Sequence, residues 1–212
     1  MGKIAKIAIT GGPCSGKTLG MAHVVKKLRA IGWQPLPVPE AATILFGIGM
    51  GAYDMKKVVA EDPHTSFLME KYIIDLQLAL EGGTEALAQT LINENVVVLC
   101  DRGLADNIGY GGSKSFEEIL RAKKMSLSDV YGRYDAVVHL VTAAIGAEGY
   151  YSNKDNRVRY EDLEKARGLD RRILAAWRPH GNLTIIDNST GFGKKKERLF
   201  QAVCGILGIE PE

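Results

Sequence analysis

The sequence predicts an α/β fold in which helices cover both faces of a parallel five-stranded sheet. Apolar stretches typical of strands alternate along the chain with stretches of helical periodicity, which is the pattern of βαβ units. The run Val96–Cys100 is uninterrupted and apolar, as expected of a strand buried on both faces of a parallel sheet. The loop at residues 11–18 is rich in glycine and joins the first strand to the first helix. At 212 residues, we expect a single domain, residues 1–212, with a small insert.

The elements of the first half follow in order. A short apolar strand is predicted at residues 4–10, and the helix after it carries its apolar side chains on one face. The second strand, 33–38, contains two prolines, so we expect it to be irregular or to lie at an edge of the sheet. Pro39 and Glu40 precede a helix, and the apolar, glycine-rich segment 45–51 is interpreted as a flexible wall of a pocket.

A long helix is predicted from residue 62 onward, and Gly82 and Gly83 are expected to interrupt it before a second helical stretch. Glu70, Gln77 and Glu81 lie on the stripe opposite its apolar face, so we expect them to be exposed; a contact of Gln77 with a nucleobase is the alternative. Later elements are short helices at 115–125 and 127–131, strands at 136–141 and 183–187, a charged helix within 157–177 and a final amphipathic helix.

Composition and charge exclude several classes of protein. The chain has 46% hydrophobic and 25% charged residues and a net charge of +2, so no global field favours nucleic acid, and none is expected as a partner. Cys14, Cys100 and Cys204 form no close pair, and the four histidines lack ligand spacing, which argues against a zinc site. Without a signal peptide or an apolar run of about 18 residues, we expect a cytoplasmic protein with no stable membrane association.

The glycine-rich loop has the complete pattern G-x-x-x-x-G-K-[ST] of a phosphate-binding loop, or P-loop. Its members are Gly11, Gly12, Pro13, Cys14, Ser15, Gly16, Lys17 and Thr18. Glycines allow the backbone N–H groups to surround a polyphosphate, and the helix N-terminus adds attraction for negative charge. We expect Lys17 to reach the β- and γ-phosphates and the Thr18 hydroxyl to bind Mg²⁺. The motif therefore predicts binding of a nucleoside triphosphate.

Polar side chains follow the other predicted strands, whose carboxyl ends meet at the ligand-binding edge of such a sheet. Asp101 follows an apolar strand, as a Walker B acid does, and is predicted to hold Mg²⁺ beside Thr18; a turn-capping Asp is the alternative. Arg102 is predicted to grip an acceptor, with a structural ion pair as the alternative. Glu40 is the candidate general base, or else a helix-terminal acid.

Residues 145–179 are predicted to form an arginine-rich lid that closes over the triphosphate. Arg157, Arg159 and Arg167 are the candidates for neutralising charge on the transferred phosphoryl group. Several acidic residues lie between these arginines and could pair with them along a helix. The alternative is therefore a solvated helix face.

The last predicted strand leads to the candidate base site. Asn188 and Thr190 are expected to lie against the nucleobase of the donor. No Asn-Lys-x-Asp follows any strand, so ATP is the expected donor and GTP the alternative. The run Lys194–Lys196 is interpreted as a solvated helix start, with lipid contact as the alternative.

The ordered set of motifs resembles one group of AAA-type ATPase and kinase-like domains. The resemblance lies in Ile9–Thr18, Pro39–Ala42, Cys100–Gly103, Tyr134–Leu140 and Ile186–Thr190 and spans about residues 4–208. This group includes the nucleotide-binding domain of the TRPL-translocation-defect protein, and NadR-type ribosylnicotinamide kinase domains are its relatives. Membership implies a kinase-type three-layer P-loop NTPase fold with sheet order 2-3-1-4-5, not a hexameric motor.

The pair Asp101-Arg102 also resembles the Asp-Arg pair of deoxynucleoside and thymidylate kinases. That resemblance implies that Arg102 contacts the acceptor and that Glu40, after the second strand, acts as the base. Gly103 stands where deoxynucleoside kinases usually have serine, which leaves the acceptor open.

The motifs together favour a Mg²⁺-dependent enzyme that moves the γ-phosphoryl group of ATP, or of GTP, to a small-molecule acceptor. A regulatory nucleotide switch that hydrolyses ATP or GTP slowly is the alternative, and a binding scaffold without turnover is a third hypothesis. The sequence leaves the acceptor and the oligomeric state open.

Overall fold

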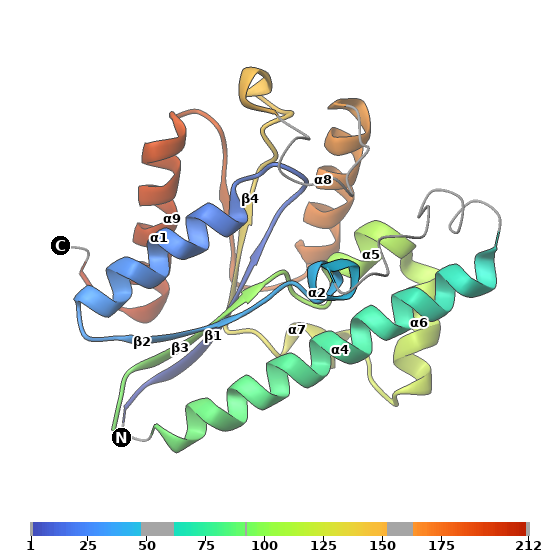
Figure 1. Ribbon diagram of the computed structural model, residues 1–212, viewed down its shortest axis with the longest axis horizontal. Helices are drawn as coiled ribbons and strands as arrows, with labels where there is room; N and C mark the ends of the chain where they lie inside the picture. The colour runs from blue at the N-terminus through green and yellow to red at the C-terminus, as the bar shows by residue number, and fades with distance from the viewer. Residues whose placement is uncertain (1, 48–61, 92, 152–162, 211–212) are drawn as a thin grey trace.

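The computed structural model describes residues 2–47, 62–91, 93–151 and 163–210. Its strands form a five-stranded parallel sheet in the order β2-β3-β1-β4-β5, with helices on both faces (Figure 1). The strands are β1 (Ile4–Thr10), β2 (Gln34–Val38), β3 (Val96–Asp101), β4 (Ala136–Leu140) and β5 (Leu183–Ile186). The predicted three-layer α/β fold is confirmed, and so is the sheet order that the family resemblance implied. The proline-containing β2 lies at an edge, as predicted.

The helices form one layer on each face of the sheet (Figure 1). On one face, α1 (Lys17–Ala30) packs against α9 (Phe192–Leu207). The other helices are α2 (Ala41–Gly47), α4 (Pro63–Thr90), α5 (Asp106–Gly111), α6 (Ser113–Ala122), α7 (Leu127–Tyr131) and α8 (Leu163–Trp177), with a 3₁₀ turn, η2 (Glu148–Tyr150). Helices α4 to α8 supply the core of the second face. No helix within the described residues combines the length and apolar character needed to cross a membrane.

Strand β3 shows how the sheet divides the core. Val97 and Leu99 join the cluster beneath α1 and α9, whereas Val96, Val98 and Cys100 join the cluster on the opposite face, because successive side chains of a strand point to opposite faces. All of these side chains are fully buried. The uninterrupted apolar run of this strand therefore reflects burial on both sides, as predicted.

Helix α4 corrects the predicted break at Gly82 and Gly83. It begins at an N-cap, Asp62, whose side chain accepts from the His64 N–H, and continues without interruption to Thr90. Each glycine in a helix interior costs about 1 kcal/mol relative to alanine. Burial of residues on both sides of the pair, among them Ile74 and Ala88, offsets that local preference.

The polar stripe of α4 is also different from the prediction. Gln77 is 6% and Glu81 0% exposed, so the expectation that these side chains face solvent is wrong. The Gln77 amide nitrogen donates to Glu81 Oε1 at 3.1 Å and to the Arg102 carbonyl at 3.3 Å, and its oxygen accepts from Asn107. These interior contacts occupy the amide that was the alternative candidate for reading a nucleobase.

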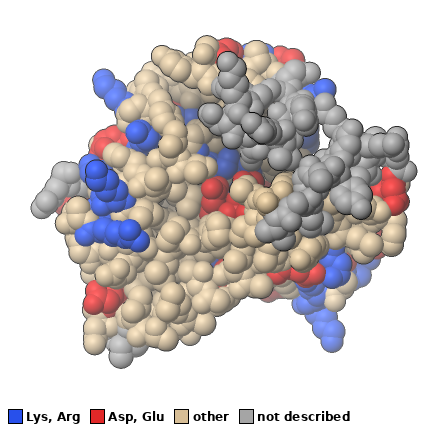
Figure 2. Space-filling model, viewed as in Figure 1, with Lys and Arg blue, Asp and Glu red and all other residues tan. Residues whose placement is uncertain are grey.

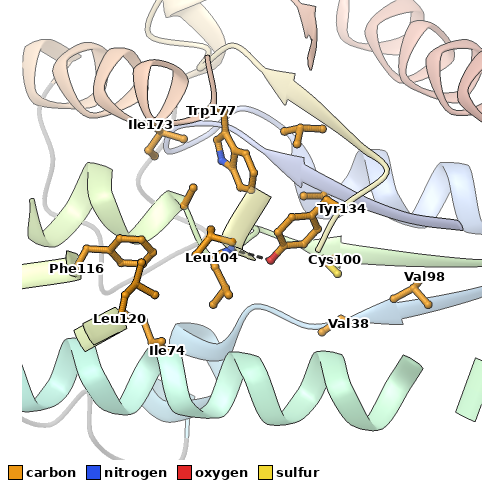
Figure 3. Packing of buried hydrophobic residues seen from close by; sticks show 14 of the residues in the cluster. Val38, Ile74, Val98, Cys100, Leu104, Phe116, Leu120, Tyr134, Ile173 and Trp177 are labelled. Atoms are coloured by element: carbon orange, nitrogen blue, oxygen red, sulfur yellow. Dashed lines mark hydrogen bonds between the residues drawn. The ribbon is translucent and has the colours of Figure 1, made fainter. Parts of the chain in front are cut away.

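Helix α8 belongs partly to the core. Ile173 and Trp177 project into the cluster shown in Figure 3, where the Trp177 ring packs edge to face against Tyr134 with centroids 5.4 Å apart. Leu169 is buried in the same cluster. The predicted lid, residues 145–179, therefore contains a core helix. The expected helical residues before Leu163 lie outside the described part of the chain.

Candidate nucleotide-binding site

The phosphate loop between β1 and α1 has a backbone that requires its glycines. Gly11 and Gly16 have φ values of +142° and +88°, which residues with a Cβ rarely adopt. A Cβ on Gly11 would lie 2.1 Å from the Leu140 carbonyl oxygen, and one on Gly16 would lie 2.4 Å from the Phe192 ring. Both the dihedral angles and the surrounding atoms therefore restrict these two positions to glycine.

Helix α1 presents its N-terminus to this loop. Its N-cap residue, Gly16, makes no side-chain capping bond, so the first backbone N–H groups of the helix remain suited to an anion. Lys17 is 6% exposed, and its Nζ donates to the carbonyls of Gly11 at 2.9 Å and Gly12 at 3.1 Å and to Ser15 Oγ at 3.2 Å. Thr18 is exposed in the first turn. The loop thus combines helix N–H groups with a cation at its centre.

Asp101 lies at the carboxyl end of β3, paired in register with Ile9 of β1. Its Oδ1 atom is buried and has no hydrogen-bond partner within the described residues. Burial raises the pKa of Asp101, an effect that Lys17 opposes and Glu40 reinforces. Mg²⁺ is commonly bound by one or two carboxylates together with substrate phosphates and water. The buried Oδ1 of Asp101 suits that role, and Thr18 stays the predicted second ligand. The described residues contain no cluster of three or more His, Cys, Asp or Glu side chains suited to a metal.

Arg102 is held firmly beside Asp101 and the phosphate loop. Its Nε donates to Glu40 Oε1 at 2.5 Å, and its Nη1 donates to the Gly11 carbonyl at 3.0 Å and to Asp106 Oδ1 at 3.3 Å. Burial opposes the charge, but Tyr110, Glu40 and Asp106 raise the pKa of Arg102. The remaining nitrogen, Nη2, is buried without a partner in the part of the chain described. The structure therefore brings Arg102 and Glu40 together, as predicted, and leaves one donor of the fork unused.

Glu40 occupies the link between β2 and α2. Its Oε2 accepts from Thr43 Oγ1 at 2.8 Å, while Oε1 pairs with Arg102. Only 15% of its side chain is exposed. The carboxylate is thus enclosed and oriented, and it also takes part in the structural ion pair that was the alternative for Arg102.

Sequence reasoning missed Asp106, which is 2% exposed in the first turn of α5. Its Oδ1 accepts from Thr10 Oγ1 and Arg102 Nη1, and its Oδ2 accepts from the Gly103 N–H at 2.9 Å and Trp177 Nε1 at 3.1 Å. One carboxylate therefore connects the end of β1, the turn after β3 and helix α8. Its donors come from separate segments, so no local pattern reveals this role.

Asp170 is a second residue that the sequence did not single out as a contact of the phosphate loop. Its Oδ1 accepts from the Gly12 N–H at 2.7 Å and from the Thr142 N–H at 3.1 Å, and His139 Nε2 lies 3.4 Å away. A Cβ on Gly12 would lie 2.7 Å from this oxygen. Asp170 thus ties helix α8 directly to the phosphate loop rather than pairing with arginines along its own helix.

The loop after β5 approaches the phosphate loop from the other side. Asn188 donates to the carbonyls of Thr142 at 2.8 Å and Ile145 at 2.7 Å, and Thr190 Oγ1 is buried without a partner among the described residues. A shallow hollow is lined by Ser189, Thr190, Gly191, Phe192, Gly193 and Lys194. The Asn188 amide is thus used to hold the loop, and the nucleobase contacts of Asn188 and Thr190 stay a prediction.

Of the three predicted lid arginines, the structure describes only Arg167. Arg157 and Arg159 lie outside the described residues. Arg167 donates to the Ala144 carbonyl at 2.6 Å, to Glu164 Oε1 at 2.5 Å and to Glu148 Oε1 at 3.0 Å. These pairs match the alternative of a charged helix face, so the catalytic role of Arg167 stays a prediction.

On the face shown in Figure 2, blue Lys and Arg side chains gather at the left edge and at the lower right, and red Asp and Glu side chains lie near the centre and beside them. The fold, the phosphate loop and the adjoining acid define a P-loop nucleotide-binding protein. A family model for the AAA domain matches residues 6–195. The chain therefore belongs to the AAA domain family, whose members bind and hydrolyse nucleotides in general. A search of curated proteins found no match.

Proposed function

We propose that the chain is a Mg²⁺-dependent kinase that transfers the γ-phosphoryl group of a nucleoside triphosphate, ATP before GTP, to a small-molecule acceptor. The observation that carries this proposal is Arg102. Three of its contacts fix the guanidinium beside the phosphate loop, while Nη2 is buried without a partner among the described residues. A buried, unused guanidinium nitrogen costs free energy unless a ligand accepts from it. A phosphate or hydroxyl oxygen of an acceptor would satisfy it.

The other residues of the site have complementary proposed roles. Gly11 to Thr18 would bind the triphosphate, with Lys17 on the β- and γ-phosphates. Thr18 and Asp101 would hold Mg²⁺, which when bound neutralises charge on the phosphates. Glu40 would orient the acceptor hydroxyl or accept its proton. Asn188 and Thr190 would border the nucleobase.

The proposed lid is restricted to the residues before the buried part of α8. Leu169, Ile173 and Trp177 are fixed in the core, so closure would involve the segment that precedes them. We propose that Arg157, Arg159 and Arg167 act from this segment. For Arg167, this requires exchanging its contacts with Glu148 and Glu164 for the phosphates, which is feasible because exposed ion pairs contribute only about 0–1 kcal/mol.

The low exposure of Glu40 and Arg102 is the observation that favours transfer over slow hydrolysis. The side chains of Glu40 and Arg102 are 15% and 7% exposed, and a site that excludes water protects the phosphoryl group from hydrolysis. A regulatory switch does not require a buried arginine with an unused donor beside the phosphate loop. This observation supports the kinase hypothesis over the nucleotide switch.

The proposal is tested by measuring turnover of ATP and GTP with Mg²⁺, alone and with a panel of nucleosides, nucleotides and ribosylnicotinamide. A kinase gives acceptor-dependent turnover and a phosphorylated product. In that assay, Arg102→Gln should reduce transfer on the order of a hundredfold while nucleotide affinity changes little. Arg121→Gln, at an exposed position, is the matched control. Slow hydrolysis that no acceptor stimulates would replace the kinase with the nucleotide switch.

A further inference from the structure

Lys195 is the member of the lysine run 194–196 that does not face solvent. It lies in the first turn of α9 and is 4% exposed, whereas Lys194 is exposed. The expectation of a solvated lysine run is therefore wrong at this position. Lys195 is buried because it lies on the side of α9 that packs against the protein, together with the buried Leu199 and Phe200.

The ammonium group of Lys195 joins three segments of the candidate site. Nζ donates to the Ser15 carbonyl of the phosphate loop at 3.1 Å, to the Val141 carbonyl after β4 at 2.7 Å, and to Asn188 Oδ1 at 2.7 Å. These bonds use all three donors of the ammonium. Asn188 in turn donates to the carbonyl of Thr142. Lys195 thus fixes the phosphate loop relative to the loop after β5.

All three acceptors of Lys195 are uncharged oxygens. Burial lowers the pKa of Lys195 to about 8; Asp170 and Asp187 counteract this effect, and Arg198 adds to it. Lys17 is the charged side chain of the phosphate loop itself, bonded to Ser15 Oγ. A buried cation whose hydrogen bonds are satisfied but whose charge is only partly compensated gains when an anion binds nearby.

We propose that Lys195 is a second phosphate-sensing lysine, which stabilises bound nucleotide from behind the phosphate loop without contacting the phosphates. Its charge attracts the polyphosphate through the Ser15 peptide, and its bonds to Val141 and Asn188 hold the loop in the binding conformation. This inference rests on the nucleotide-binding part of the proposed function. It is independent of the acceptor and of phosphoryl transfer.

A dependence of nucleotide affinity on pH follows from this arrangement. The bound anion favours the charged form of Lys195, so binding raises the pKa of this group above its value of about 8 in the free protein. Affinity is then greatest below pH 8, where Lys195 is already charged, and decreases as the pH rises above 8. In the same range, binding is accompanied by proton uptake.

The experiment is calorimetric titration of the protein with the Mg²⁺ complex of a non-hydrolysable ATP analogue at several pH values from about 7 to 9.5. At pH 7, Lys195→Met should bind at least tenfold more weakly, a loss of about 1.4 kcal/mol, and should lose the pH dependence. Lys195→Arg keeps its charge at every pH in this range, so it should retain affinity but show no proton uptake. Lys26→Met removes an exposed lysine of α1 and should bind as the wild type does.

The outcomes separate this inference from the proposed function. Lys17→Ala in the same titration tests the phosphate loop itself, and wild-type protein that binds no nucleotide would overturn both. If the wild type binds and Lys17→Ala does not, but Lys195→Met binds normally, the inference alone is wrong. If Lys195→Met does not fold, the test is the proton uptake on binding at about pH 8.5, compared between wild type and Lys195→Arg. Equal uptake by the two proteins refutes the role of Lys195.

Discussion

Replacing Glu81 by glutamine should lower the free energy of unfolding by about 3 kcal/mol. Glu81 is 0% exposed in α4. Its Oε2 accepts from Lys6 Nζ at 2.6 Å and from Arg133 at 2.9 Å and 3.1 Å, and its Oε1 accepts from the Tyr134 hydroxyl at 2.8 Å. Loss of the carboxylate charge leaves Lys6, which is 5% exposed, paired with Glu85, whose side chain is 38% exposed.

The magnitude follows from the burial of the partners. Breaking a buried ion pair from one side costs about 3–5 kcal/mol. The lower end applies because Lys6 retains its ion pair with Glu85 and because 21% of the Arg133 side chain reaches water. For a domain of this size each kcal/mol corresponds to about 2–4 °C. The melting temperature of Glu81→Gln should therefore decrease by about 6–12 °C.

The assay is urea unfolding followed by tryptophan fluorescence, which reports on Trp33 and Trp177, both buried in the core. Glu85→Gln is the matched control because it contacts the same Lys6 nitrogen from a carboxylate that is 38% exposed. That variant should lose less than about 1 kcal/mol. Equal losses in Glu81→Gln and Glu85→Gln would refute the reasoning, since burial would then not determine the cost.

Two further substitutions test the packing around the site. Gly103→Ala should lower the free energy of unfolding by about 1–3 kcal/mol, because its Cβ would lie 2.5 Å from Trp177 Cζ2 in a rigid core. Gly181→Ala, whose Cβ would meet no atom within 4 Å, is the control. Equal thermal stabilities of the two variants would contradict the argument. Asp106→Asn should lower stability by about 3 kcal/mol, since an amide group replaces an acceptor of charged and neutral donors; thermal unfolding at wild-type temperature would show that the carboxylate contacts of Asp106 contribute little.

Structural features that depend on a continuous stretch of residues could be predicted from the sequence. The phosphate loop has a fixed spacing, and the strand that ends at Asp101 is a continuous apolar run, so the fold class and this edge of the sheet follow from local patterns. The order of the strands came from the family resemblance. Placement of Arg102 beside Glu40 also followed, because each residue comes within two positions of the end of one of two neighbouring parallel strands.

Features that depend on distant partners could not be predicted. Gln77 and Glu81 have the spacing of an exposed polar stripe. The approach of Lys6 and Arg133 favours burial of Glu81, and Gln77 bonds to Glu81 in turn. The acceptors of Lys195 are two backbone carbonyls and an amide oxygen. No sequence motif identifies such acceptors. Helical periodicity identifies a face, but the identity of its neighbour comes from the tertiary fold.

The turn after β3 connects the buried polar network around Glu81 to the candidate site. Arg102 has a φ of +74°, a conformation that costs of order 1–3 kcal/mol for a non-glycine residue. The turn is held where Tyr134 accepts from the Leu104 N–H at 2.8 Å (Figure 3) and where Gln77 donates to the Arg102 carbonyl. Both of these side chains also hydrogen bond to Glu81.

Strain of this kind persists only where the surroundings over-determine it. Here the surroundings are the Glu81 network on one side and Asp106 on the other, and their combined effect is to direct the Arg102 guanidinium to the Gly11 carbonyl and to Glu40. A substitution at Glu81 therefore removes stability and, at the same time, support for the geometry of Arg102, the arginine that we propose binds the acceptor. The buried carboxylate of Glu81 in α4 is thus part of the physical basis of the site.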